Sequence, residues 1–143
     1  MDIQINYGAV FVAAVAYFLL GWAWHSSLLF MKPWAKEMGL DKLNKKEKEK
    51  RMKEMPKGMI GNFLAVLVTA YVLAHSVSSA RQMNFSGLTA GLTIGFWVWL
   101  GYIATTLLNT VLWEGRSWKL YFINVGYHLV GMLAMGSILA VWP

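Results

Sequence analysis

A set of polar side chains interrupts the long apolar segments of the chain, and these are the residue types that could do chemistry inside a membrane. They are His25, Asn62, Thr105, Asn109, Asn124 and His128. Asn and His are costly in hydrocarbon unless each finds a hydrogen-bonding partner. When every apolar segment is laid across a membrane, all of these residues except the deeper Thr105 and His128 fall at one shared depth. We therefore expect them to turn inward, toward one another or toward a water-filled cavity.

Two interpretations of these polar residues follow from their shared depth. In the first, they line a pocket that opens to the cytosol and binds a small molecule or relays protons, with His25 and His128 titrating near neutral pH. Glu114 and Arg116 would then stand at the mouth of this pocket. In the second, they form interhelical hydrogen bonds worth about 0.6 to 2 kcal/mol each, and the two charged residues hold a tight turn. The second is the simpler interpretation.

Neither a catalytic nor a metal-binding pattern occurs in the sequence. It lacks G-x-S-x-G, H-E-x-x-H and paired intramembrane aspartates, which would supply a nucleophile or a base. It contains no cysteine, and among its three histidines His75 falls near the opposite interface from His25. We therefore expect no enzymatic activity, no metal and no cofactor.

Composition places the chain in the membrane class. It has 143 residues, of which 57% are hydrophobic and 14% charged, outside the usual balance of soluble domains. Charged residues are absent from four stretches, each long enough for a spanning helix: 3–31, 58–80, 82–113 and 120–143. A soluble bundle would instead give each helix a charged outer face. We predict an all-α fold, a single polytopic membrane domain over 1–143, with transmembrane helices at about 7–30, 59–80, 86–112 and 118–142.

One of these predicted helices carries glycines at helical spacing. Gly87, Gly91 and Gly95 recur every four residues, so they share one face of the helix 86–112. Such a glycine zipper lets another helix backbone approach closely. The neighbour is either a helix of the same chain or one of a second protomer. We expect a homo-oligomer, because four short helices enclose little interior.

The segment 32–57 is predicted to be a basic cytoplasmic loop. It holds ten of the thirteen Lys and Arg residues. We expect Asp41 to cap a short helix that rests on the membrane surface through Met52 and Met55, and Pro56 to end it. Anionic lipid is the expected partner, at about 1 kcal/mol per basic side chain near the surface. Nucleic acid is not expected, because acidic residues are interleaved and no aromatic platform accompanies the charge.

The distribution of basic residues also predicts the orientation. Beyond the basic loop, Arg116 and Lys119 flank the third link, whereas Arg81 stands alone on the other side. The positive-inside rule then places both basic links in the cytosol and both termini outside. Short links make neighbouring helices antiparallel, so we predict two antiparallel hairpins in the cell membrane.

Two stretches of the sequence carry a resemblance to a known family. They are Trp24-His25-Ser26-Ser27-Leu28-Leu29-Phe30 and the run from Ala104-Thr105-Thr106-Leu107-Leu108-Asn109 through Leu112-Trp113-Glu114-Gly115-Arg116. In these residues the chain resembles a prokaryotic family of small four-span membrane proteins known only as a domain of unknown function. The resemblance implies the fold and a cell-membrane location, and it supplies no activity.

The sequence therefore favours a structural or interaction protein of the membrane that homo-oligomerises. The alternative is a small transporter, channel subunit or ligand-binding membrane protein that uses the cytoplasmic-side polar pocket. Replacing Asn109 and Asn124 by leucine separates the two hypotheses. Activity lost at unchanged stability indicates a pocket, whereas disrupted assembly indicates interhelical hydrogen bonds.

Overall fold

The computed structural model describes residues 3–142, and these residues are almost entirely helical. Along the chain the elements are α1 (Tyr7–Trp24), α2 (Met31–Glu37), the 3₁₀ turn η1 (Leu40–Lys42), α3 (Lys45–Gln82), α4 (Gly87–Val98), the π-helix η2 (Trp99–Ala104), α5 (Thr105–Leu112) and α6 (Trp118–Val141). Four spans in the described residues are long and apolar enough to cross a membrane: α1, α3, the continuous α4–η2–α5 helix and α6. The predicted all-α fold with four such helices is confirmed.

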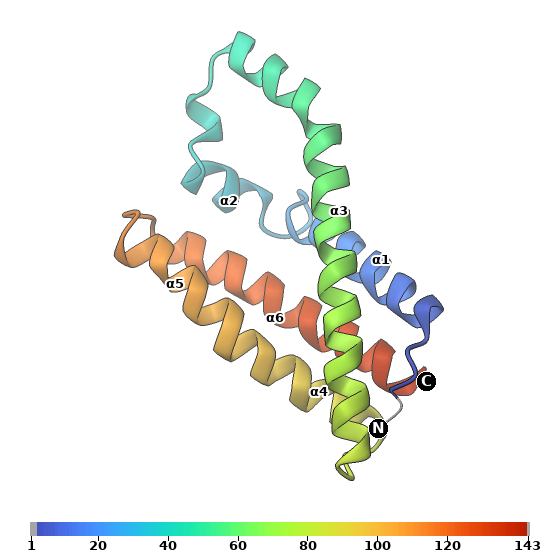
Figure 1. Cartoon of the computed structure of the whole chain (residues 1–143). Helices are drawn as coiled ribbons and strands as arrows, with labels where there is room; N and C mark the ends of the chain where they lie inside the picture. The colour runs from blue at the N-terminus through green and yellow to red at the C-terminus, as the bar shows by residue number, and fades with distance from the viewer. Residues whose placement is uncertain (1–2, 143) are drawn as a thin grey trace.

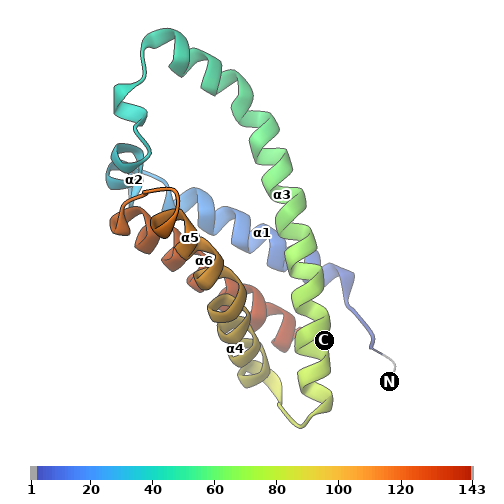
Figure 2. The same ribbon diagram turned by 60° about the vertical axis from the view of Figure 1, so that its left-hand side comes forward.

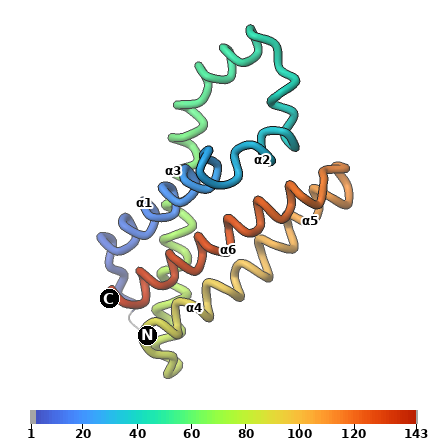
Figure 3. Tube along the Cα trace, turned by 180° about the vertical axis from the view of Figure 1, so that it is seen from behind, coloured from blue at the N-terminus to red at the C-terminus, as the bar shows by residue number. Residues whose placement is uncertain are grey.

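The last helix stands at the centre of the arrangement. α6 contacts both α1 and α4, and α3 crosses against all three (Figure 1). Both ends of the chain lie at the same end of the bundle as the α3–α4 turn, whereas α2 and the α5–α6 turn lie at the opposite end (Figures 1 and 3). The N-terminal part of α3 leaves the other helices and extends beyond them (Figure 2). The packed core therefore lies toward the termini.

α1 begins at a side-chain cap and ends earlier than predicted. The Asn6 side-chain oxygen accepts a hydrogen bond from the Ala9 amide at 3.1 Å. The helix stops at Trp24 rather than near residue 30. Ser26 competes for the backbone there, because its hydroxyl donates to the Ala23 carbonyl at 2.6 Å. The chain then turns into α2, which contacts α6.

α3 is a single helix of 38 residues that begins inside the predicted loop. Asn44, not Asp41, caps it: the Asn44 side chain accepts from the Glu47 amide at 2.9 Å, and the Glu47 carboxylate accepts from the Asn44 amide at 2.8 Å. The expected helix end at Pro56 is wrong, because the helix continues through this proline. Proline removes one backbone donor, and the surrounding turns are exposed, so water can reach the carbonyl of Met52.

The third span contains a π-helical turn that the sequence did not lead us to expect. Over η2 the hydrogen bonds widen to i→i+5, which leaves carbonyl groups for side chains to bond. The Thr105 hydroxyl donates to the Gly101 carbonyl at 2.7 Å, and the Tyr121 hydroxyl of α6 donates to the Ala104 carbonyl at 3.0 Å. The wide turn is therefore held both from within its own helix and from α6.

The glycine face of α4 packs inside the chain. A Cβ at Gly91 would overlap the backbone of Gly136, and one at Gly95 would stand 2.7 Å from the Met132 carbonyl oxygen. α4 and α6 thus meet backbone to backbone, as glycines allow. Gly87 takes no part, because it opens α4 and has nothing within 4 Å of a Cβ placed on it. Two of the three predicted packing residues therefore join helices of the same chain.

A tight turn joins α5 to α6 and connects both to α2. Gly115 adopts a left-handed conformation with φ of 67°. The Ser117 hydroxyl accepts from the Leu120 amide at 3.1 Å, which caps α6, and donates to the Glu37 carboxylate of α2 at 2.5 Å. This end of the bundle is thereby fixed against the segment that follows α1.

Candidate functional site

Two tyrosines and two histidines gather where α1 packs on α6, and we call Tyr17, His25, Tyr127 and His128 the tyrosine–histidine cluster. The Tyr17 hydroxyl hydrogen-bonds Nδ1 of His128 across the two helices. The ring of Tyr127 lies 5.0 Å from that of Tyr17 and 5.4 Å from that of His25, the latter edge to face. The two tyrosines are buried, at 4% and 8% exposure. The cluster is thus a buried polar contact between two spans.

Each tyrosine of the cluster fits against a glycine of the opposite helix. A Cβ on Gly131 of α6 would collide with the Tyr17 ring, and a Cβ on Gly21 of α1 would stand 2.7 Å from the Tyr127 hydroxyl. The two contacts are reciprocal, because a tyrosine of each helix packs against a glycine of the other. They bring the helices close enough for the hydrogen bond between Tyr17 and His128.

His25 lies at the edge of the cluster and caps the C-terminal end of α1. Its Nδ1 lies 2.8 Å from the Gly21 carbonyl oxygen, and because a carbonyl only accepts, Nδ1 carries the proton and donates it. Its ring also meets Trp34 of α2 edge to face at 5.0 Å. His25 therefore connects the end of α1, the cluster and α2.

Two tryptophans attach α6 to its neighbours. Nε1 of Trp24 in α1 donates to the Ile123 carbonyl at 3.0 Å, and Nε1 of Trp99 in η2 donates to the Val125 carbonyl at 2.9 Å. An indole N–H away from water needs an acceptor, and both find one on the backbone of α6. α1 and η2 therefore both bond to the same turn of α6.

The polar residues predicted for a pocket are spread over several helices. Only His25 and His128 belong to the cluster. Asn62 on α3 and Asn109 on α5 are exposed, and their side chains form no hydrogen bond with another described residue. Thr105 is exposed too and bonds within its own helix.

The remaining candidates are spread over α6 and the α5–α6 turn. Asn124 is half-buried, and its side chain forms no hydrogen bond with another residue in 3–142. Glu114 and Arg116 are exposed and form no ion pair with each other; the Arg116 amide donates instead to the Thr110 carbonyl at 2.9 Å. The predicted residues do not by themselves assemble a pocket in this arrangement of helices.

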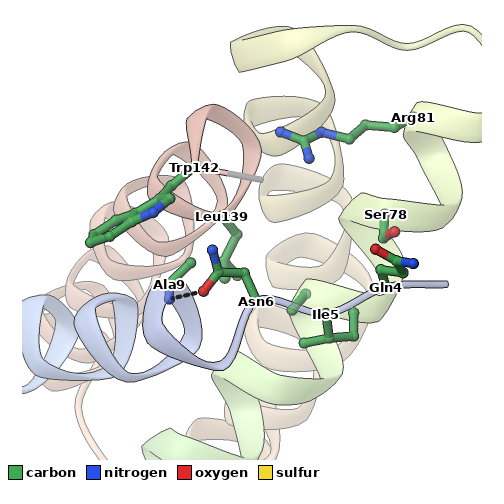
Figure 4. A pocket seen from close by; sticks show the side chains of 9 residues that line it. Gln4, Ile5, Asn6, Ala9, Ser78, Arg81, Leu139 and Trp142 are labelled. Atoms are coloured by element: carbon green, nitrogen blue, oxygen red, sulfur yellow. Dashed lines mark hydrogen bonds between the residues drawn. The ribbon is translucent and has the colours of Figure 1, made fainter.

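A small polar cavity lies instead at the end of the bundle that holds both termini (Figure 4). Its volume is about 30 Å³, room for one or two water molecules. Arg81 and Ser78 of α3 border it, together with Asn6 before α1 and Trp142 after α6. None of these residues was predicted to form a site, because they come from ends of helices that only the fold brings together.

The chemistry available to the cluster is that of hydrogen bonding between helices. Its phenol hydroxyls and imidazole nitrogens both donate and accept. Within residues 3–142 there is no group of three or more His, Asp or Glu side chains that could hold a metal ion. What the arrangement can do is bind two spans to each other at a fixed separation.

Sequence reasoning missed the pairing of tyrosines with glycines, although a signal was present. Tyr17 and Gly21 are four residues apart on α1, and Tyr127 and Gly131 are four residues apart on α6. In antiparallel helices equal spacings can face each other, so each tyrosine meets the glycine of the other helix. A repeated Tyr-x-x-x-Gly pattern on two spans was the feature to look for.

The fold and the cluster together define an all-helical protein with the span lengths and composition of a multi-pass membrane protein. The polar groups of the cluster and the two tryptophans form contacts between helices. The chain belongs to the family described as "Protein of unknown function (DUF1761)", which matches residues 8–140. No curated protein and no solved structure matches the chain. The resemblance to a family of unknown function is confirmed, and it transfers no activity.

Proposed function

We propose that the chain is a structural or interaction subunit of a prokaryotic cell membrane and that it assembles with copies of itself. The supporting observation is a row of small and polar residues on the third span, Gly101, Thr105 and Asn109, which we call the exposed ridge. These residues are spaced by four, so they lie on successive turns of one helix face, and all are exposed. Small residues at such spacing are typical of a contact between helices.

The exposed ridge has the composition of a helix-packing surface. Nothing lies within 4 Å of a Cβ placed on Gly101, so another backbone can approach closely there. The Asn109 side chain forms no hydrogen bond with a described residue, and an unpaired amide is costly at membrane depth. A second copy related by a two-fold axis would satisfy it, because an amide both donates and accepts.

Two features of the fold bear on this proposal: one concerns the surface through which copies meet, and the other concerns transport. The glycine face of α4 is already covered by α6, so a contact between copies needs another surface, and the exposed ridge supplies it. The residues expected around a transport pocket lie on separate helices, Asn62 on α3 and Asn109 on α5, and neither lines the small polar cavity. In the proposed homo-oligomer the copies therefore contact each other through the exposed ridge, and not through Gly91 and Gly95.

Single cysteines test this interface, because the chain contains none of its own. We expect Thr105→Cys to form disulfide-linked dimers when the protein is oxidised in lipid, since a two-fold contact holds the two thiols close together. Phe122→Cys is the matched control. Phe122 is exposed on α6 and, like Thr105, lies within two helical turns of the α5–α6 link, so it should cross-link only at the rate of random collision.

A second variant tests the interface without oxidation. Gly101→Leu is expected to shift dimers to monomers without unfolding the chain, because the leucine meets open space in the single chain and blocks only a neighbour. Cross-linking that is equal at positions 105 and 122 would contradict the proposal. An unchanged monomer–dimer distribution of Gly101→Leu in lipid would contradict it as well.

A further inference from the structure

An apolar groove opens between α3 and the third span. Its volume is about 430 Å³, and its lining includes Val68, Val72 and Leu73 of α3, Val98 of α4, Tyr102 of η2 and Met132 of α6. Val68, Val72 and Tyr102 are 64%, 58% and 75% exposed, so the rim faces the surroundings of the bundle. In a membrane those surroundings are lipid.

Besides Tyr102, two hydroxyl residues border the groove, and neither makes it polar. The Thr69 hydroxyl donates to the Ala65 carbonyl at 3.0 Å, and the Ser76 hydroxyl donates to the Val72 carbonyl at 3.2 Å. Both hydroxyls are thereby satisfied within α3 and need no partner from outside. An occupant of the groove is therefore a hydrocarbon where it touches these side chains.

A smooth face of α3 leads from the groove toward the start of the helix. Ala65, Gly61 and Gly58 precede Val68 at intervals of three or four residues, so they continue one helix face. All three are exposed, and nothing lies within 4 Å of a Cβ placed on either glycine. These three positions are uncovered and carry no bulky side chain.

The helix segment beyond this face is strongly basic. Residues 45–57 hold seven Lys or Arg side chains and three Glu, a net charge of +4, and all of them are exposed. At about 1.5 Å per residue, Lys57 lies about 16 Å along the helix from Val68, which is close to half of a hydrocarbon core of roughly 30 Å. The basic segment and the near edge of the groove are therefore one lipid leaflet apart.

We infer that α3 binds one anionic phospholipid. The phosphate lies among basic side chains that include Lys53 and Lys57, and an acyl chain follows the smooth face into the groove. Charge decides between this occupant and a second copy of the chain. Copies share one orientation in the membrane, so a second copy on this face would set another +4 segment beside the first, whereas an anionic headgroup neutralises it.

Lipid retention measured by native mass spectrometry tests the headgroup contact. The full chain is released from nanodiscs that contain phosphatidylglycerol and phosphatidylcholine, and one phosphatidylglycerol should be retained in preference. Lys53→Gln combined with Lys57→Gln is expected to weaken its binding about 30-fold, from the loss of two basic side chains at the surface. The charge-matched control, Lys36→Gln combined with Lys119→Gln on α2 and α6, should retain the lipid.

Filling the groove tests the acyl-chain contact separately. Val72→Trp leaves every charge in place and should reduce retention of phosphatidylglycerol. Val130→Trp, the same substitution at an exposed position of α6 outside the groove lining, should not. Circular dichroism of each variant verifies that the helices remain folded.

Three results would overturn the lipid site. One is equal retention of the two phospholipids, and another is an equal loss in each variant and its control. The third is a Val72→Trp protein that dissociates into monomers with its lipid retention unchanged, which would assign the groove to a second copy. The exposed ridge is on the third span, whose Val98 and Tyr102 also border the groove, so cross-linking at Thr105 is measured in each variant to distinguish the two contacts.

Discussion

Gly131 leaves room on α6 for the Tyr17 ring, and Gly21 leaves room on α1 for the Tyr127 hydroxyl. Between these two fits runs the hydrogen bond from Tyr17 to His128. Hydrogen bonds between spans contribute only about 0.6 to 2 kcal/mol, because the separated helices also find partners. At the scale of residues, the α1–α6 contact therefore depends on the steric fit of tyrosine to glycine as well as on the polar groups.

This fit predicts that Gly131→Ala destabilises the protein by about 1 to 3 kcal/mol, the usual range for overpacking a filled site. The new methyl group would collide with the buried Tyr17 ring. Gly126→Ala on the same helix is the control, because its Cβ would stand 3.4 Å from the Trp24 ring, an ordinary contact. Unfolding in detergent at rising temperature measures both variants, and equal midpoints would show that the fit carries no stability.

At the scale of elements, α3 departs furthest from what its sequence pattern suggested. It is long enough, at about 57 Å for 38 residues, to cross a membrane and continue outside it. Its exposed first turns gain nothing from tertiary packing, so local interactions hold them. The capping box of Asn44 and Glu47 fixes the start of the helix and thereby presents the basic side chains of residues 45–57 in order.

Removal of this cap is expected to loosen only the beginning of α3. Asn44→Ala should speed amide hydrogen exchange over residues 45–51 roughly fivefold, as expected for a cap worth about 1 kcal/mol. Exchange in the buried part of the helix, near Leu73 and Val77, should not change, because packing protects it. Lys46→Ala is the control, and a loss of protection along all of α3 would contradict the local role of the cap.

At the scale of the whole molecule, charge is gathered at one end of the bundle. The end with α2, the start of α3 and the α5–α6 turn carries all Lys and Arg residues except Arg81. The positive-inside rule assigns this end to the cytosol and both termini to the outside. The orientation is a prediction from the sequence. The fold is compatible with it, because the two basic links lie at the same end of the bundle (Figure 1).

Accessibility of single cysteines tests the orientation in cells. Met83→Cys in the α3–α4 turn should react with a membrane-impermeant maleimide on intact cells. Glu114→Cys in the α5–α6 turn should react only after the membrane is permeabilised. Both positions are exposed, so burial does not bias the comparison. The reverse pattern would place the basic end outside.

The polar residues show where sequence reasoning stopped. His25 and His128 were correctly singled out, and the structure brings them into one cluster. Their partners Tyr17 and Tyr127 were missed, because the Tyr-x-x-x-Gly spacing gains its meaning only once the two helices are known to pack antiparallel. Asn62 and Asn109 were expected to face inward because of their polarity. They lie on exposed faces, because α3 packs through a later set of apolar residues that includes Val66, Ala70 and Leu73, and α5 buries none of its residues.

The sequence by itself determined that the chain has four apolar helices, because transfer of about 20 uncharged residues into hydrocarbon depends on the segment alone. It also determined which residues of α4 are small enough for a close contact. Only the tertiary structure decided that α6 covers those glycines, that α1 ends at Trp24 and that α3 begins at Lys45. The helices are apolar on nearly every side, so periodicity does not mark their contact faces, and steric fit between side chains selects them.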